Sequence, residues 1–171
     1  MPTTTYDPIA SYTFAGAAAS YTFTNIPQTY TDLRFVLNVA GDTLNAFVKA
    51  NFNGDVAANY SGTTLYANGT TSGSTRFSAG GGSQIWVTDY VSFSQTLGES
   101  LFTFDVMNYS NSTTYKSCLT RGSRTTSTGS WYGSELQVVM WRNTNSVTSI
   151  AFSTSAGNIS AGSTITMYGI L

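Results

Sequence analysis

Apolar and polar residues alternate along Asp32-Leu33-Arg34-Phe35-Val36-Leu37-Asn38-Val39, and this alternation decides the fold class. The odd-numbered positions hold Leu, Phe, Leu and Val, whereas Asp, Arg and Asn occupy three of the positions between them. A β-strand turns successive side chains to opposite faces, so the pattern predicts a strand with one buried face and one mostly wetted face.

The same two-residue period recurs on both sides of this stretch, in runs rich in β-branched and aromatic residues that Gly, Asn, Ser and Asp separate. We expect eight to eleven strands, within the ranges 9–14, 20–24, 33–39, 46–52, 63–66, 83–87, 102–106, 115–120, 136–141, 147–153 and 164–170. Such frequent short strands favour two packed sheets, because a single open sheet would leave an apolar face in water. The predicted fold class is therefore all-β, a jelly-roll-like antiparallel β-sandwich.

A length of 171 residues predicts one domain over 1–171, with allowance for an N-terminal arm over residues 1–8. The dipeptides Asn53-Gly54 and Asn68-Gly69 tolerate positive φ and predict tight turns. Two longer hydrophilic stretches, 70–83 and 121–134, are expected to be surface loops.

Composition argues against catalysis. The chain has no His and 9% charged residues, while Ser and Thr make up about three residues in ten. Proton transfer near neutral pH relies first on His and then on tuned acids or lysines, so we predict that the protein is not an enzyme. A net charge of −1 leaves no broad basic field, so nucleic acid and membrane are not expected partners. Cys118 is expected to be a buried core residue.

The few constellations that could carry chemistry are weak. Asn51-x-Asn53-Gly54-Asp55 places oxygen ligands at alternate positions but lacks the distal Glu of a calcium loop, so a plain hairpin is the favoured interpretation. Glycoside hydrolysis needs two nearby carboxylates, and Glu99 and Asp105 are the one candidate pair. Acidic residues at such a spacing occur by chance, so we expect no active site here. We predict no catalytic, metal or cofactor site.

Aromatic and basic residues are the better candidates for interface or ligand contacts. Trp131 and Tyr132 lie in a polar loop, where they are either exposed or folded back over the sandwich. Lys116, Arg121 and Arg124 form a local basic cluster, which is either a solvated loop face or a docking site for an acidic neighbouring subunit.

Four segments of the chain resemble a family of small tailed-phage virion structural proteins of the capsid decoration or cement type. The segments are Tyr6-Asp7-Pro8-Ile9-Ala10, Tyr21 to Leu33 with its Ile26-Pro27-Gln28-Thr29-Tyr30 core, Phe52-Asn53-Gly54-Asp55 with Asn59-Tyr60-Ser61, and Ala161 to Ile170. The resemblance spans both ends and the middle of the chain, and the family has no catalytic residues to transfer.

The resemblance implies a protein of the virion, on the capsid surface, assembled in the host cytoplasm. Its expected partners are the major capsid protein and further copies of itself, as a homotrimer, and its expected action is to bridge capsid subunits by binding alone. Two alternatives stay open at this point. One is a tail-fibre or receptor-binding module that recognises host glycans, and the other is a small carbohydrate-active enzyme.

Overall fold

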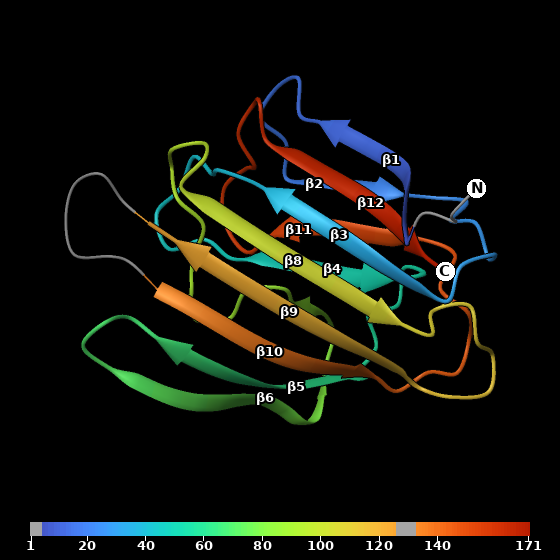
Figure 1. The fold of residues 1–171 in the computed structure, drawn as a ribbon. Helices are drawn as coiled ribbons and strands as arrows, with labels where there is room; N and C mark the ends of the chain where they lie inside the picture. The colour runs from blue at the N-terminus through green and yellow to red at the C-terminus, as the bar shows by residue number, and fades with distance from the viewer. Residues whose placement is uncertain (1–4, 126–132) are drawn as a thin grey trace.

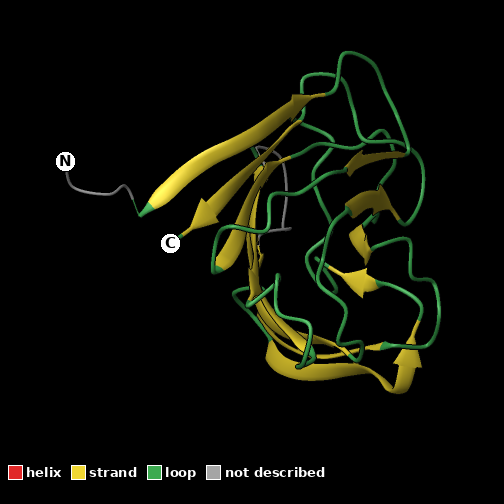
Figure 2. Cartoon of the chain, turned by 90° about the vertical axis from the view of Figure 1, so that its right-hand side faces the viewer, coloured by secondary structure: helices red, strands yellow, loops and turns green. Residues whose placement is uncertain are grey.

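The computed structural model describes residues 5–125 and 133–171, which form two antiparallel sheets and no helix (Figure 1). The large sheet has eight strands, in the order β1 (Tyr6–Thr13), β12 (Thr164–Ile170), β3 (Asp32–Asn38), β8 (Ser100–Met107), β9 (Lys116–Arg124), β10 (Gly133–Trp141), β5 (Tyr60–Ala67) and β6 (Ser72–Gly82). The small sheet has four, in the order β2 (Ser20–Phe23), β11 (Ile150–Thr154), β4 (Val48–Phe52) and β7 (Ile85–Trp86). Seen edge-on, the large sheet curves around the small one (Figure 2).

The strands are connected as in a jelly roll. The consecutive pairs β1 and β2, β3 and β4, β7 and β8, and β11 and β12 each have one strand in either sheet. This alternation builds the double sheet of a jelly roll, and β9, β10, β5 and β6 extend its larger layer. The predicted all-β sandwich is confirmed.

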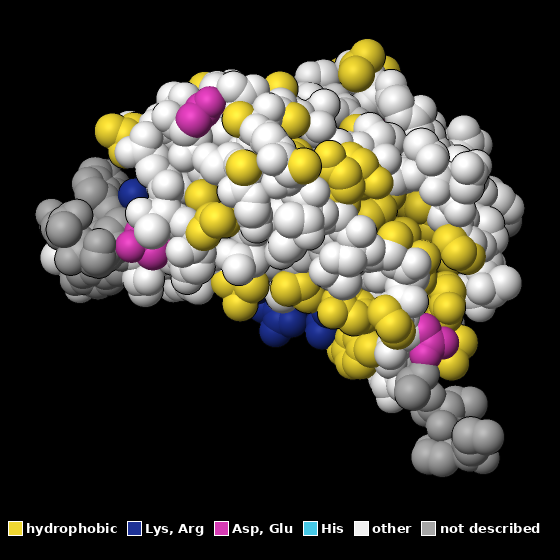
Figure 3. Space-filling model, turned by 90° about the horizontal axis from the view of Figure 1, so that it is seen from above, with side chains coloured by type: hydrophobic (Ala, Val, Ile, Leu, Met, Phe, Trp, Pro, Cys, Tyr) yellow, Lys and Arg dark blue, Asp and Glu magenta, His cyan; other side chains and the backbone are white. Residues whose placement is uncertain are grey.

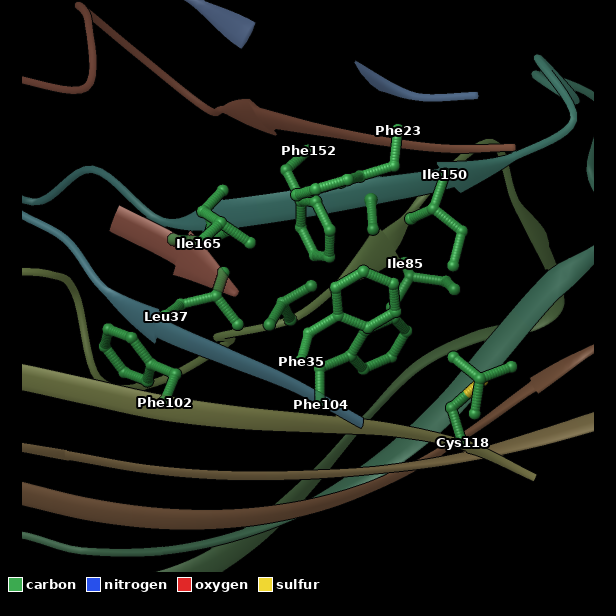
Figure 4. Packing of buried hydrophobic residues seen from close by; sticks show 14 of the residues in the cluster. Phe23, Phe35, Leu37, Ile85, Phe102, Phe104, Cys118, Ile150, Phe152 and Ile165 are labelled. Carbon is green, nitrogen blue, oxygen red and sulfur yellow. The ribbon is translucent and has the colours of Figure 1, made fainter. Parts of the chain in front are cut away.

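Phenylalanine rings fill the space between the sheets (Figure 4). Phe35 of β3 packs against Phe152 of β11, with ring centroids 5.1 Å apart, and against Phe104 of β8 at 6.1 Å. Phe23 of β2 lies 5.7 Å from Phe35. The odd positions of β3, which the alternating pattern assigned to the core, are fully buried. Cys118 of β9 is also buried, as expected.

The predicted turns form, but one of them joins the two sheets. Asn53 and Gly54 both have positive φ, at 52° and 68°. Since β4 belongs to the small sheet and β5 to the large sheet, this turn starts a crossing between layers, and the expected hairpin is wrong. Asn68-Gly69 does close a hairpin, between β5 and β6, with the Asn68 N–H donating to the Thr71 carbonyl at 3.0 Å.

Three expected loop or arm regions are corrected. Residues 72–82 form the edge strand β6 and not a surface loop. The stretch 121–134 was expected to be a loop, but β9 continues to Arg124 and β10 begins at Gly133. Residues 6–8 pair with β12, so they belong to the sheet and not to an N-terminal arm.

Candidate functional site

The outer face of the large sheet, turned away from the small sheet, presents a group of exposed apolar side chains. They are Leu65, Leu101, Leu136, Val138 and Met140, which we call the outer patch, and each is between 39% and 55% exposed. Its members come from β8, β10 and β5, with β9 between β8 and β10. Leu136 pairs directly with Leu65, and Val138 pairs with Leu119 of β9. In the described part of the chain, no further strand layer covers this face.

Part of the outer patch lines a shallow groove of about 770 Å³ that crosses the four strands. Leu65, Leu101 and Leu136 supply its apolar walls, and Thr103 and Arg121 supply polar groups. Strand pairing fixes these side chains in register, because Thr103, Arg121, Leu136 and Leu65 lie opposite one another on successive strands. The groove is therefore part of a rigid sheet surface, suited to contact with another surface.

One pair of charges on this face is joined by hydrogen bonds. Asp105 of β8 accepts two hydrogen bonds from Arg34 of β3, at 2.6 Å from Nε and 2.8 Å from Nη2. This bidentate bond to Asp105 is the main reason that the pKa of Arg34 is raised. Arg121 lies farther off, with Nη2 3.9 Å from Asp105, and its side chain is half exposed. Arg121 can thus meet a partner on this face, and so can the exposed Arg76, which lies opposite Thr63 on the neighbouring strand.

The structure separates the three cations that the sequence grouped. Lys116 is fully buried, and its ammonium donates to the carbonyls of Thr114 at 2.8 Å and Thr144 at 3.1 Å. Burial also lowers its pKa. Because successive side chains of a strand face opposite sides, Lys116 and Arg124 point inward from β9 while Arg121 points outward. The expected basic cluster does not form, since these residues lie in a strand and not in a loop.

Arg124 instead lies at the inner side of the sheet, where its Nη1 donates to Ser92 Oγ at 2.6 Å. Trp131 and Tyr132, the two aromatic candidates, lie outside the described residues. The carboxylates of Glu99 and Asp105 have separate partners, because Glu99 accepts from the Ser94 hydroxyl at 2.6 Å while Asp105 binds Arg34.

Asp55, which belongs to the calcium-loop-like segment of the sequence, holds neighbouring segments of the chain together through hydrogen bonds. Its carboxylate accepts hydrogen bonds from Trp141 Nε1 at 2.7 Å, from Asn59 Nδ2 at 2.8 Å and from the Ala57 N–H at 2.8 Å. Among the residues described, no group of three or more His, Cys, Asp or Glu side chains is placed to hold a metal ion. Nor does this part of the chain contain a helix long and apolar enough to cross a membrane.

The structure contains a buried acid beneath the 88–92 segment that the sequence analysis did not predict. Glu135 of β10 is 5% exposed, and its Oε2 accepts the backbone N–H groups of Asp89, Tyr90 and Val91 at 3.2, 2.8 and 3.0 Å. Burial raises the pKa of Glu135, although these three bonds act in the opposite direction. Glu135 occupies an inward position of an alternating strand, which the sequence pattern normally gives to an apolar residue.

Comparison with known proteins adds no family. No family model matches the chain, and neither does any curated protein. Among solved structures, a candidate pore-forming toxin from Bacteroides vulgatus aligns with 92% of this chain at 9% identity, with a TM-score of 0.09. The chain covers 60% of that protein. A likeness at this level carries no argument about fold or function.

Proposed function

We propose that this protein is a structural component of a tailed-phage virion, a decoration or cement protein that binds the assembled shell through the outer patch. One observation supports this proposal above the others: an exposed apolar surface lies on the uncovered face of a rigid sheet. Arg121, Arg76 and Arg142 lie beside it. The resemblance of four chain segments to small virion proteins gives the setting. The proposed action is binding, with no chemical step.

Burial of the outer patch would supply the binding free energy. Each of its half-exposed aliphatic side chains would contribute on the order of 1 kcal/mol when a partner covers it. Arg121 at the rim of the groove can select orientation, because a misplaced partner would bury its charge without a counter-charge. On the side of the molecule seen in Figure 3, hydrophobic side chains gather over one part and few charged side chains are visible.

The proposal includes the assembly that the resemblance implies. Three copies would surround a threefold or quasi-threefold position and bridge adjacent subunits of the major capsid protein. The added contact area would resist internal pressure. A low-charge surface suits this arrangement, because few ions are stranded when several interfaces form at once.

Binding to preformed shells tests the proposal directly. Purified protein is mixed with shells of the major capsid protein encoded in the same genome, and co-sedimentation gives the copies bound per subunit. We expect a fixed stoichiometry and an increase in the temperature at which the shells disassemble. No binding, or binding without a fixed ratio, would contradict the proposal.

A pair of matched variants localises the contact. Val138→Glu places a carboxylate in the middle of the outer patch, whereas Val56→Glu makes the same change at a position that is 69% exposed and outside the large sheet. We expect V138E to weaken shell binding at least tenfold, since it buries an unpaired charge, and V56E to bind like the wild-type protein. If the two variants weakened shell binding equally, the outer patch would not be the surface that contacts the shell.

A further inference from the structure

A second cavity lies on the inner side of β9 and β10, away from the outer patch. It has a volume of about 400 Å³ and is more enclosed than the outer groove. Residues from the loop before β4, the β5–β6 turn, the 89–92 segment and the end of β9 line it. The side chains that matter below are Asn45, Phe47, Asn68, Asp89, Tyr90 and Arg124.

Two aromatic rings and Val91 form the apolar part of the lining, and each ring is supported by another ring. Tyr90 stacks on Tyr66 with centroids 3.5 Å apart and an angle of 16° between the ring planes, yet remains 38% exposed. Phe47 meets Trp86 edge to face at 5.8 Å. Rings held in this way lose little conformational entropy when a ligand packs on them.

The polar lining keeps unused hydrogen-bonding capacity. Asn68 uses only its Oδ1, which accepts the Thr71 N–H at 2.8 Å and caps the β5–β6 turn. Asn45 makes no side-chain hydrogen bond to any other described residue. Asp89 Oδ2 accepts from Thr64 at 3.0 Å, and the guanidinium of Arg124 donates to Ser92 through Nη1 at 2.6 Å. Both donors and acceptors are therefore available to a ligand.

The floor of the cavity is fixed in advance. Glu135 binds three successive backbone N–H groups of residues 89–91 through one carboxylate oxygen, so the backbone that carries Asp89 and Tyr90 is tied to β10. A binding surface that is already in place costs less to organise when the ligand arrives.

We propose that this cavity binds an uncharged carbohydrate ring. Asp89 and Arg124 contribute opposite charges to the lining, so neither an anion nor a cation is favoured overall. The apolar faces of a sugar ring can pack on Tyr90 and Phe47, while its hydroxyl groups, each both donor and acceptor, match the mixed amide, carboxylate and guanidinium lining. The volume falls within the range of about 300–1,000 Å³ that small-ligand sites occupy. This proposal does not depend on shell binding.

The test uses methyl α-glucoside, methyl α-mannoside and methyl β-galactoside as probes, with saturation-transfer NMR and calorimetry as readouts. We expect at least one probe to bind with a Kd on the order of 1 mM or tighter. Phosphate and choline serve as charged probes. No transfer from any glycoside at about 10 mM, or tighter binding of either charged probe, would overturn the proposal.

Variants connect any binding to this cavity. Tyr90→Ala removes the stacking surface, and Asn45→Gly removes an amide at a position whose φ of 58° suits glycine. We expect each to weaken glycoside binding about five- to tenfold. The control Tyr115→Ala removes an equally aromatic side chain that is 55% exposed elsewhere and should bind like the wild-type protein. Binding that survives both cavity variants would place the sugar site elsewhere and overturn the proposal.

A free sugar and a ring within a longer glycan share this chemistry. Comparing each methyl glycoside with its linear trisaccharide separates them, because contacts beyond one ring raise the affinity only for the chain. Equal affinities support the cavity as a single-ring site, and a tighter trisaccharide supports it as a site for glycan chains.

Discussion

Cys118 illustrates how position controls the chemistry of a side chain. It lies on the inward face of β9 and is completely buried. Burial raises the pKa of the Cys118 thiol far above its usual range, so the reactive thiolate is scarce in the folded protein. The sequence already favoured a core role for this residue.

The first prediction concerns this thiol. A thiol-specific disulfide reagent should leave the native protein unmodified at pH 8 and should modify one thiol per chain after denaturation in urea. The modification is followed by absorbance. Rapid labelling of the native protein at a rate close to that of the denatured chain would show that Cys118 is accessible.

Glu135 gives the second prediction, on pH. Burial raises its pKa above the ordinary value of 4.5, so the folded protein binds this proton more tightly than the unfolded chain. As pH rises from 4.5 through the folded-state pKa, the folded state holds more protons than the unfolded state, and stability falls. Glu135→Gln cannot ionise and keeps a carbonyl oxygen for the three N–H groups.

The free energy of unfolding of E135Q, relative to that of the wild-type protein, should therefore increase as pH rises above about 4.5. Urea denaturation at several pH values between 4 and 8 measures both proteins. Parallel curves over this range would mean that Glu135 does not titrate differently in the two states, and a relative decrease would mean that its pKa is lowered by folding.

At the scale of the element, strand β6 marks the limit of the sequence pattern. All eleven expected strand ranges contain a strand, because their buried faces carry large apolar residues. In contrast, β6 is an edge strand whose described side chains are mostly small or polar, and its pairing with β5 depends on backbone hydrogen bonds. Backbone pairing does not require an apolar alternation, so no hydrophobic pattern marks this strand in the sequence.

The same limit affected the candidate site. The separation of Lys116, Arg121 and Arg124 depends on β9 extending to Arg124. The Gly and Ser residues near the end of this strand are typical of a loop, so the sequence predicted one there. Once the strand is extended, the strict alternation of side chains places Arg121 opposite to the other two. The outer patch could not be predicted for a related reason. In β10 the outward residues Leu136 and Val138 alternate with the inward residues Val139 and Trp141, and because both sets are apolar the sequence does not show which set is buried.

Gly122 carries the third prediction, at the level of strand pairing. It lies opposite Phe102 between β9 and β8, and a Cβ added there would lie 2.2 Å from the Phe102 ring. Gly122→Val should therefore destabilise the protein by about 1–3 kcal/mol, because the ring must leave its site in the core. The neighbouring change Ser123→Ala, at an exposed position, should stay within about 0.5 kcal/mol of the wild-type protein.

Urea denaturation of the two variants measures the difference. A Gly122→Val protein as stable as Ser123→Ala would mean that β8 and β9 can shift to admit the side chain, which the continuous eight-residue register between them argues against.

At the scale of the whole molecule, the jelly roll gives one large sheet two unlike faces. Its inner face packs on the small sheet and, beyond the end of that sheet, contributes to the carbohydrate cavity. Its outer face carries the outer patch. Arg121 and Arg124, three residues apart on β9, line the groove on one face and the cavity on the other. An adhesive face and a ligand cavity can therefore coexist without sharing a side chain.

The fourth prediction follows from this separation. Val138→Glu should lose shell binding at least tenfold and retain glycoside binding, whereas Tyr90→Ala should lose glycoside binding about five- to tenfold and retain shell binding. Both proteins should unfold within about 1 kcal/mol of the wild type, since each change is made at a partly exposed side chain. Additive losses in the double variant would confirm two independent surfaces, because distant sites without shared partners combine additively. A single variant that abolishes both activities while remaining folded would instead mean that the two faces are coupled through the strands they share, and would contradict their independence.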